Sequence, residues 1–240
     1  SLWIQLGVLG ALFSLPAWLV LPPVAAPMLS TPLPSTPLPG EHYKVPAGLR
    51  GLLACYAIFG FGYILPATFL PVLARSVVDD PRLFGLAWPV FGTTAVISIF
   101  VAGWCMRRAS RMRVWAVSSA VMGVGVLLPS LWLSGWSIGL SALCVGGTFM
   151  IITVAGMQEI RARATGDPTR LVARMTSGFA LGQIAGPVAS SLLLYVPAFR
   201  DHGLNVALQA GAALLLIAAV WLWRESAQSS TPSTETSNAR

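Results

Sequence analysis

Long apolar stretches alternate with short polar gaps along the chain. The charge-free stretches run about from Leu2 to Leu29, Gly51 to Ala74, Leu83 to Met106, Val114 to Gln158, Met175 to Phe199 and Gly203 to Trp223. The fourth is about twice the roughly 20 residues that a helix needs to cross a bilayer, and Pro129, Ser134 and Gly135 mark a turn inside it. The pattern therefore predicts an all-α polytopic membrane protein with seven transmembrane helices.

Basic residues lie in alternate gaps. One set of gaps holds Lys44, Arg50, Arg107, Arg108, Arg111, Arg113, Arg161, Arg163, Arg170, Arg174, Arg224 and Arg240, and the other set holds Arg75, Arg82 and Arg200. Short cytoplasmic loops retain Lys and Arg during insertion. The asymmetry predicts a multi-pass protein of the inner membrane with its C-terminus in the cytoplasm.

Composition excludes an ordinary soluble domain, since 55% of the residues are hydrophobic and only 10% are charged. The net charge of +7 follows from the loop arginines, which we expect to contact lipid headgroups and not nucleic acid. Cys55, Cys105 and Cys144 fall inside predicted spans, and His42 and His202 lie in loops on opposite sides. We therefore predict no metal site, no cofactor and no catalytic residues.

Several tryptophans fall near the predicted membrane interfaces, where an indole can keep its N–H in the headgroup region. We interpret them as anchors: Trp88, Trp104, Trp115, Trp132, Trp136, Trp221 and Trp223.

A proline-rich segment divides the chain. Residues 24–49 are predicted to be a cytoplasmic linker, because prolines cannot continue a helix and favour extended chain. A docking role for its proline motifs is the alternative. The remaining predicted parts are a single helix over residues 1–23, a six-helix bundle over 50–224 and a disordered cytoplasmic tail over 225–240.

The loop from Gly103 to Arg113 combines a small residue with four arginines. A small residue lets two helix ends approach, and guanidinium groups donate to carboxylates or to helix C-terminal carbonyls. Gly103, Arg108 and Arg111 resemble the loop signature of the major facilitator superfamily, whereas Arg107 stands where that family often has Asp. Arg107 is thus expected to find an acid elsewhere, with Glu159 as the candidate. For Glu159, a structural ion pair is favoured over a role in coupling.

Small residues recur every four positions at Gly178, Gly182 and Gly186, followed by Pro187. The spacing predicts close helix packing, and the proline predicts a bend. The motif resembles the Gly-x-x-x-Gly-Pro signature of facilitator-superfamily antiporters. Packing and a gating bend both remain open as its role.

The wider pattern is similar to the YbfB/YjiJ family of bacterial facilitator-superfamily transporters. Segments 63–75, 88–92, 147–150 and 158–168 carry this resemblance, which extends over about residues 50–224. It implies that these six helices are the C-terminal half of a facilitator fold and that the first span is helix six. It also implies a missing N-terminal half of the same protein as the bundle's partner.

Such a fold places its solute between the two halves. No acidic residue lies in mid-span, so the candidate cavity residues are neutral: Tyr56, Tyr63, Thr148, Thr153 and Gln183. The resemblance implies secondary active transport of a small organic solute by alternating access, with proton-coupled efflux as one form. The alternatives are a membrane-embedded enzyme and a noncatalytic scaffold or sensor.

Overall fold

The computed structural model describes residues 2–20, 47–77, 87–164, 168–197 and 202–228. The chain divides into two units, Ser1–Lys44 and Val45–Arg240, which we describe separately. The first contributes helix α1 (Leu2–Val20), whose apolar side chains such as Ile4, Phe13 and Leu19 are exposed within it.

The second unit contains six long helices. They are α2 (Ala47–Val77), α4 (Ala87–Met106), α5 (Arg111–Leu131), α6 (Gly135–Arg163), α7 (Thr169–Tyr195) and α8 (Gly203–Gln228). Each is long and apolar enough to cross a membrane, and the described residues form no strand. The predicted all-α polytopic fold is confirmed. Helix α1 is not among these six helices, so a seventh membrane span stays a prediction.

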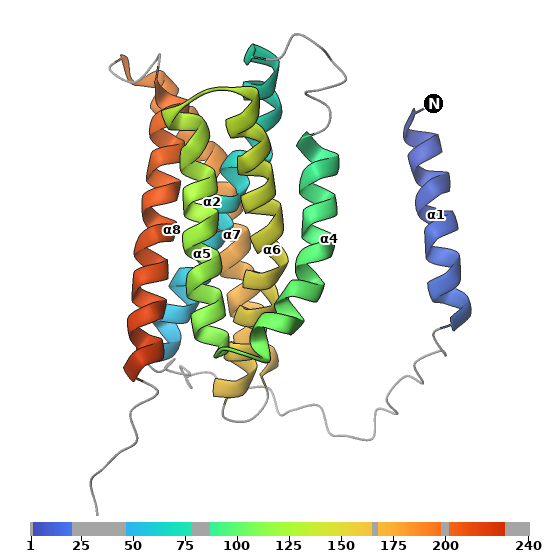
Figure 1. Cartoon of the computed structure of the whole chain (residues 1–240), viewed down its shortest axis with the longest axis vertical. Helices are drawn as coiled ribbons and strands as arrows, with labels where there is room; N and C mark the ends of the chain where they lie inside the picture. The colour runs from blue at the N-terminus through green and yellow to red at the C-terminus, as the bar shows by residue number, and fades with distance from the viewer. Residues whose placement is uncertain (1, 21–46, 78–86, 165–167, 198–201, 229–240) are drawn as a thin grey trace, which may run out of the picture. The chain divides into compact units, whose positions relative to one another are not determined.

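Successive helices of this unit run in opposite directions (Figure 1). Helix α5 packs against α6 and α8, α4 packs against α6, and α7 packs against α2. The starts of α2, α5 and α7 therefore share one end of the unit with the ends of α4, α6 and α8. All described arginines except Arg75 lie at or near this end, which we call the arginine-rich end.

The predicted turn inside the longest apolar stretch is present. Helix α5 ends at Leu131, two residues after Pro129, and α6 begins at Gly135. Ser134 caps α6, because its hydroxyl accepts from the Ser137 N–H while the Ser137 hydroxyl accepts from the Ser134 N–H, both at 3.1 Å. This reciprocal cap satisfies backbone donors that the helix start leaves free.

Most helices continue beyond the apolar stretches that predicted them. Helix α7 begins at Thr169, before Met175, and α8 continues to Gln228. The predicted disorder from residue 225 is wrong for Glu225–Gln228, since the Ser226 hydroxyl is buried and donates to the Trp223 carbonyl at 2.6 Å. Charged residues end a hydropathy signal without ending a helix. The predicted linker is wrong for residues 47–49, which belong to α2. Its residues 24–46 and the rest of the tail lie outside the described residues.

Glycines bring the backbones of α2 and α7 into contact. A Cβ atom at Gly182 would overlap the carbonyl oxygen of Ala57, and one at Gly60 would overlap the carbonyl oxygen of Phe179. A Cβ at Gly186 would overlap the Ile64 side chain. Close packing against α2 therefore explains the four-residue spacing of Gly182 and Gly186. Pro187 lies inside a continuous α7, and its gating role stays a prediction.

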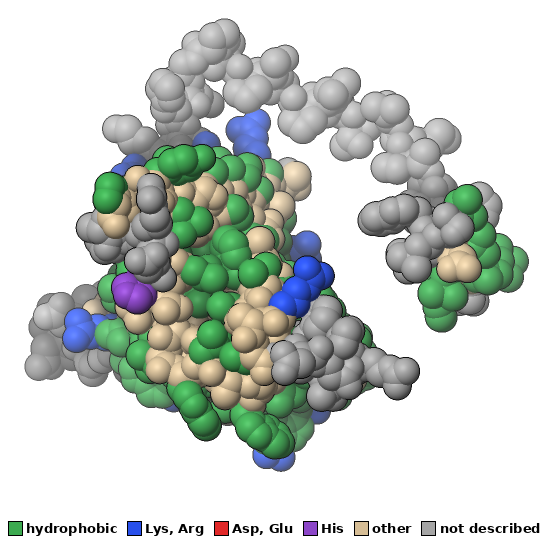
Figure 2. All heavy atoms as spheres, turned by 90° about the horizontal axis from the view of Figure 1, so that it is seen from above, with side chains coloured by type: hydrophobic (Ala, Val, Ile, Leu, Met, Phe, Trp, Pro, Cys, Tyr) green, Lys and Arg blue, Asp and Glu red, His purple; other side chains and the backbone are tan. Residues whose placement is uncertain are grey.

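Exposure differs strongly between the helices. Only 17% of the most apolar window is buried in α4 and in α7, against 44–56% in the other four spans. Hydrophobic side chains occupy much of the coloured surface at the end shown in Figure 2. The exposed apolar surface requires lipid or another protein surface as its surroundings.

Trp115 departs from the anchor prediction, because it is 1% exposed and belongs to the core.

Candidate functional site

Six aromatic rings from four helices meet inside the second unit. This aromatic cluster consists of Tyr56, Phe59 and Tyr63 of α2, Phe91 of α4, Phe149 of α6 and Phe179 of α7. Its closest ring centroids are those of Tyr63 and Phe149, 4.5 Å apart, and those of Phe59 and Phe179, 5.1 Å apart. Tilted and edge-on rings at such distances attract one another beyond their burial.

The α2 residues reach the cluster because positions 56, 59 and 63 share one helix face. Phe59 is 0% exposed and Tyr56 is 3% exposed, so these two form the floor of the cluster. The other four rings are half-buried. The cluster therefore has a packed base and an open aromatic surface.

The predicted cavity residues are placed unequally. The Tyr56 hydroxyl interacts with the Thr153 side chain, and the Thr153 hydroxyl donates to the Phe149 carbonyl at 2.9 Å. Thr148 is buried and donates to the Cys144 carbonyl of its own helix at 2.7 Å. Gln183 is half-buried beside Gly182 on α7. The structure thus brings Tyr56, Tyr63 and Thr153 to one place.

Sequence reasoning missed the phenylalanines at positions 91, 149 and 179. Each lies in a predicted span without a polar group or a spacing that sets it apart from ordinary apolar residues. Only the fold shows that they meet the tyrosines of α2.

A small apolar pocket adjoins the cluster between α2, α4 and α6. Its cavity volume is about 20 Å³, and it is lined by Pro66, Ala67, Leu70, Pro71, Trp88, Phe91, Ala142 and Val145. Since Phe91 also belongs to the aromatic cluster, the apolar surface continues along α2 away from the arginine-rich end.

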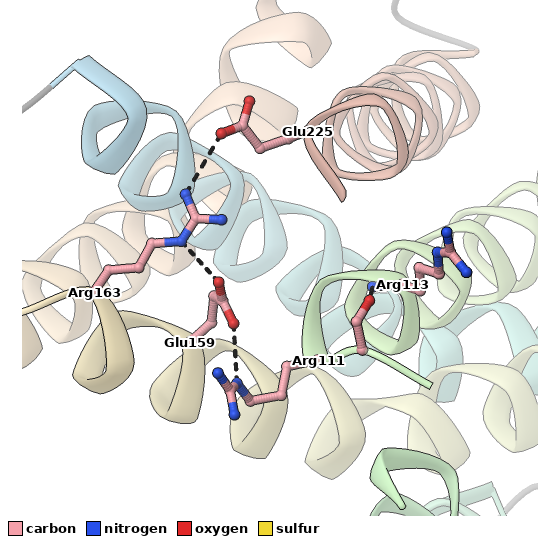
Figure 3. Close-up of polar contacts among 6 residues, drawn as sticks. Arg111, Arg113, Glu159, Arg163 and Glu225 are labelled. Atoms are coloured by element: carbon pink, nitrogen blue, oxygen red, sulfur yellow. Dashed lines mark hydrogen bonds and ion pairs between the residues drawn. The ribbon is translucent and has the colours of Figure 1, made fainter. Parts of the chain in front are cut away.

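An ion-pair network joins three helix ends at the arginine-rich end (Figure 3). The Glu159 carboxylate accepts from Arg111 Nε at 3.0 Å and from Arg163 Nε at 2.7 Å. Arg163 also reaches the Glu225 carboxylate at 3.5 Å. Glu159 is 7% exposed, so its charge is satisfied by two guanidinium groups from α5 and α6. The suggested pairing of Glu159 with Arg107 is wrong, because Arg111 and Arg163 occupy this carboxylate.

The other residues of the loop motif are arranged differently from the expectation. A Cβ atom at Gly103 would meet no described atom within 4 Å, so none of the described helices approaches closely there. The Arg108 guanidinium lies 4.1 Å from the centre of the Trp104 ring. Arg107 and Arg108 are exposed, whereas Arg111 turns toward Glu159.

A polar cavity of about 320 Å³ opens beside this network. Its lining residues are Met106, Ala109, Ser110, Arg111, Met112, Glu159, Arg163 and Ser226. In the described part of the chain, no cluster of three or more His, Cys, Asp or Glu residues is arranged to hold a metal ion.

Comparison with known proteins identifies one family and no individual protein. No curated protein and no solved structure matches the chain. The sequence model of a family described as uncharacterised MFS-type transporter YbfB matches residues 1–223, which is nearly the whole chain. The chain therefore belongs to the YbfB-type family of major facilitator superfamily transporters.

Proposed function

We propose that this protein moves a small organic solute across the membrane by alternating access, and that the aromatic cluster is the surface that contacts the solute. Family membership supports a transporter. The observation that carries the assignment of the site is that α2, α4, α6 and α7 all contribute rings to one partly open surface. Facilitator transporters bind their solutes near the membrane midplane, between two halves.

The chemistry of the surface favours a solute with an apolar or aromatic part. Tyr63 offers a hydroxyl and a ring face, while Phe149 and Phe179 offer ring faces only. The described acidic side chains, Glu159 and Glu225, belong to the network at the arginine-rich end. Proton coupling would consequently draw on an acid outside the described spans.

The exposed helices α4 and α7 support a second part of the proposal. Each contributes one ring to the cluster, Phe91 and Phe179, and both bury little of their surface within the unit. In our proposal, these helices face the other six-helix half of the transporter. We place the arginine-rich end in the cytoplasm of the bacterial inner membrane, because loops rich in arginine are retained there.

Replacing Tyr63 by Ala is expected to lower transport by the full-length protein about tenfold, the equivalent of one lost ring contact of about 1.4 kcal/mol. The measurement is uptake or efflux of a panel of small organic solutes in proteoliposomes, with and without a proton gradient. Tyr63→Phe separates the ring from the hydroxyl: it should retain transport if the ring alone binds.

Trp136→Ala is the matched control, because Trp136 is 86% exposed at the start of α6, outside the cluster and on neither α4 nor α7. It should transport like the unmodified protein. Normal transport by Tyr63→Ala would remove the cluster from the solute path, and a full panel without any transported solute would contradict the proposed function.

A further inference from the structure

Positive charge at the arginine-rich end exceeds what its described carboxylates neutralise. Four arginines occur between positions 107 and 113, and among them Arg111 pairs with Glu159. Glu159 and Glu225 are the acidic residues in the described part of the chain, and both contact Arg163. Among the described residues, the surface around the start of α5 therefore carries more positive than negative charge.

Two of these arginines lie over exposed indole rings. Arg108 lies 4.1 Å from the Trp104 ring centre on α4, and Arg113 lies 5.9 Å from that of Trp223 on α8. Trp104 is 48% exposed and Trp223 is 53% exposed. Figure 3 shows the Arg113 side chain lying apart from the Glu159 network. A guanidinium that lies on a ring keeps N–H donors at its edge for an anionic oxygen.

Exposed aliphatic side chains continue from these pairs along the helices. On α5, Arg113 is followed on the same face by Val117, Val121 and Val124, each at least 40% exposed. This stripe extends over about 16 Å at 1.5 Å per residue, close to the roughly 15 Å of one bilayer leaflet. On the neighbouring α8, Trp223 is followed by the exposed Val220 and Ile217.

We propose that this surface binds an anionic phospholipid. Arg113 and Trp223 hold the phosphate, and the stripes on α5 and α8 receive an acyl chain. Arg108 on Trp104, five residues before Arg113 in the sequence, adds positive charge in the headgroup region. We call Arg108, Trp104, Arg113 and Trp223 the arginine–tryptophan surface. A free phosphate ion would use the arginines but not the aliphatic stripes below them, so the combination fits a lipid.

The experiment measures binding of phosphatidylglycerol to the purified full chain in neutral detergent, by native mass spectrometry and by the rise in melting temperature on lipid addition. Removing both charges with Arg108→Gln and Arg113→Gln should weaken lipid binding about 30-fold. This factor is the typical contribution of one interfacial Arg to lipid binding, counted for both residues. Arg108→Lys with Arg113→Lys should lose less, because charge remains while the planar group is lost.

Arg107→Gln is the matched control, since Arg107 is exposed in the same loop and outside the arginine–tryptophan surface. It should bind within about fivefold of the unmodified protein, the loss expected for one general surface charge. Each melting-temperature rise is taken relative to the same variant without lipid, which separates binding from stability. Equal rises with phosphatidylcholine or with inorganic phosphate, or unchanged binding in the double Gln variant, would overturn the proposal.

Discussion

Gly182→Ala is expected to destabilise the protein by about 3 kcal/mol, at the upper end of overpacking costs in well-packed interiors. The new methyl group would overlap the Ala57 carbonyl oxygen and the Phe61 backbone nitrogen. These are backbone atoms, which cannot rotate away as a side chain can, so α2 and α7 must separate. The measurement is the midpoint of unfolding in mixed micelles, followed by tryptophan fluorescence.

Gly178→Ala provides a matched comparison one turn earlier on the same helix. A Cβ there would meet the Ala57 Cβ at 3.6 Å, an ordinary contact. This variant should be as stable as the unmodified protein or slightly more so, because Ala favours a helix over Gly. Equal stabilities of the two variants would show that α2 and α7 do not touch at Gly182.

Glu159→Gln is expected to cost about 2–3 kcal/mol of stability, because it leaves two guanidinium groups around an uncharged amide. The expected loss of stability is lower than for a fully buried ion pair, since the Arg111 side chain is 43% exposed. The same unfolding measurement applies. The loss should be smaller when Arg163→Gln is added, because the second change removes one of the unpaired charges.

Arg161→Gln is the control for this network, as Arg161 is exposed on the last turns of α6 and carries the same charge. Its stability should stay within about 0.5 kcal/mol of the unmodified protein. A loss comparable to that of Glu159→Gln would mean that total charge, and not the specific ion pairs, stabilises this end.

The hydropathy pattern was sufficient to locate the six spans of the second unit and the turn at Ser134. It was less accurate at the helix ends, where Thr169 and Gln228 extend α7 and α8 beyond the apolar stretches. Alternating charge likewise predicted which helix ends lie together. The spacing of Glu159 and Arg163 at i and i+4 could also have indicated an ion pair, but the contribution of Arg111 from another helix could not be read along the chain.

Residues that look alike in the sequence have different surroundings in the fold. Gly182 is closed in by backbone while Gly103 is open, and Trp115 is buried while Trp104 is half-exposed. Tyr63 was a predicted cavity residue, but its neighbours Phe149 and Phe179 were not. Each difference depends on how a helix is rotated about its own axis.

The sequence by itself determined the number of spans in the second unit, their alternating direction and the end that collects arginine, because membrane insertion responds to local hydropathy and flanking charge. The tertiary structure alone decided which rings converge, which glycines are packed and which arginine reaches Glu159. In a lipid environment both the packed and the lipid-facing sides of a helix are apolar, so amphipathicity does not mark the packed face. That face is selected by close packing between helices, which depends on residues far apart in the chain.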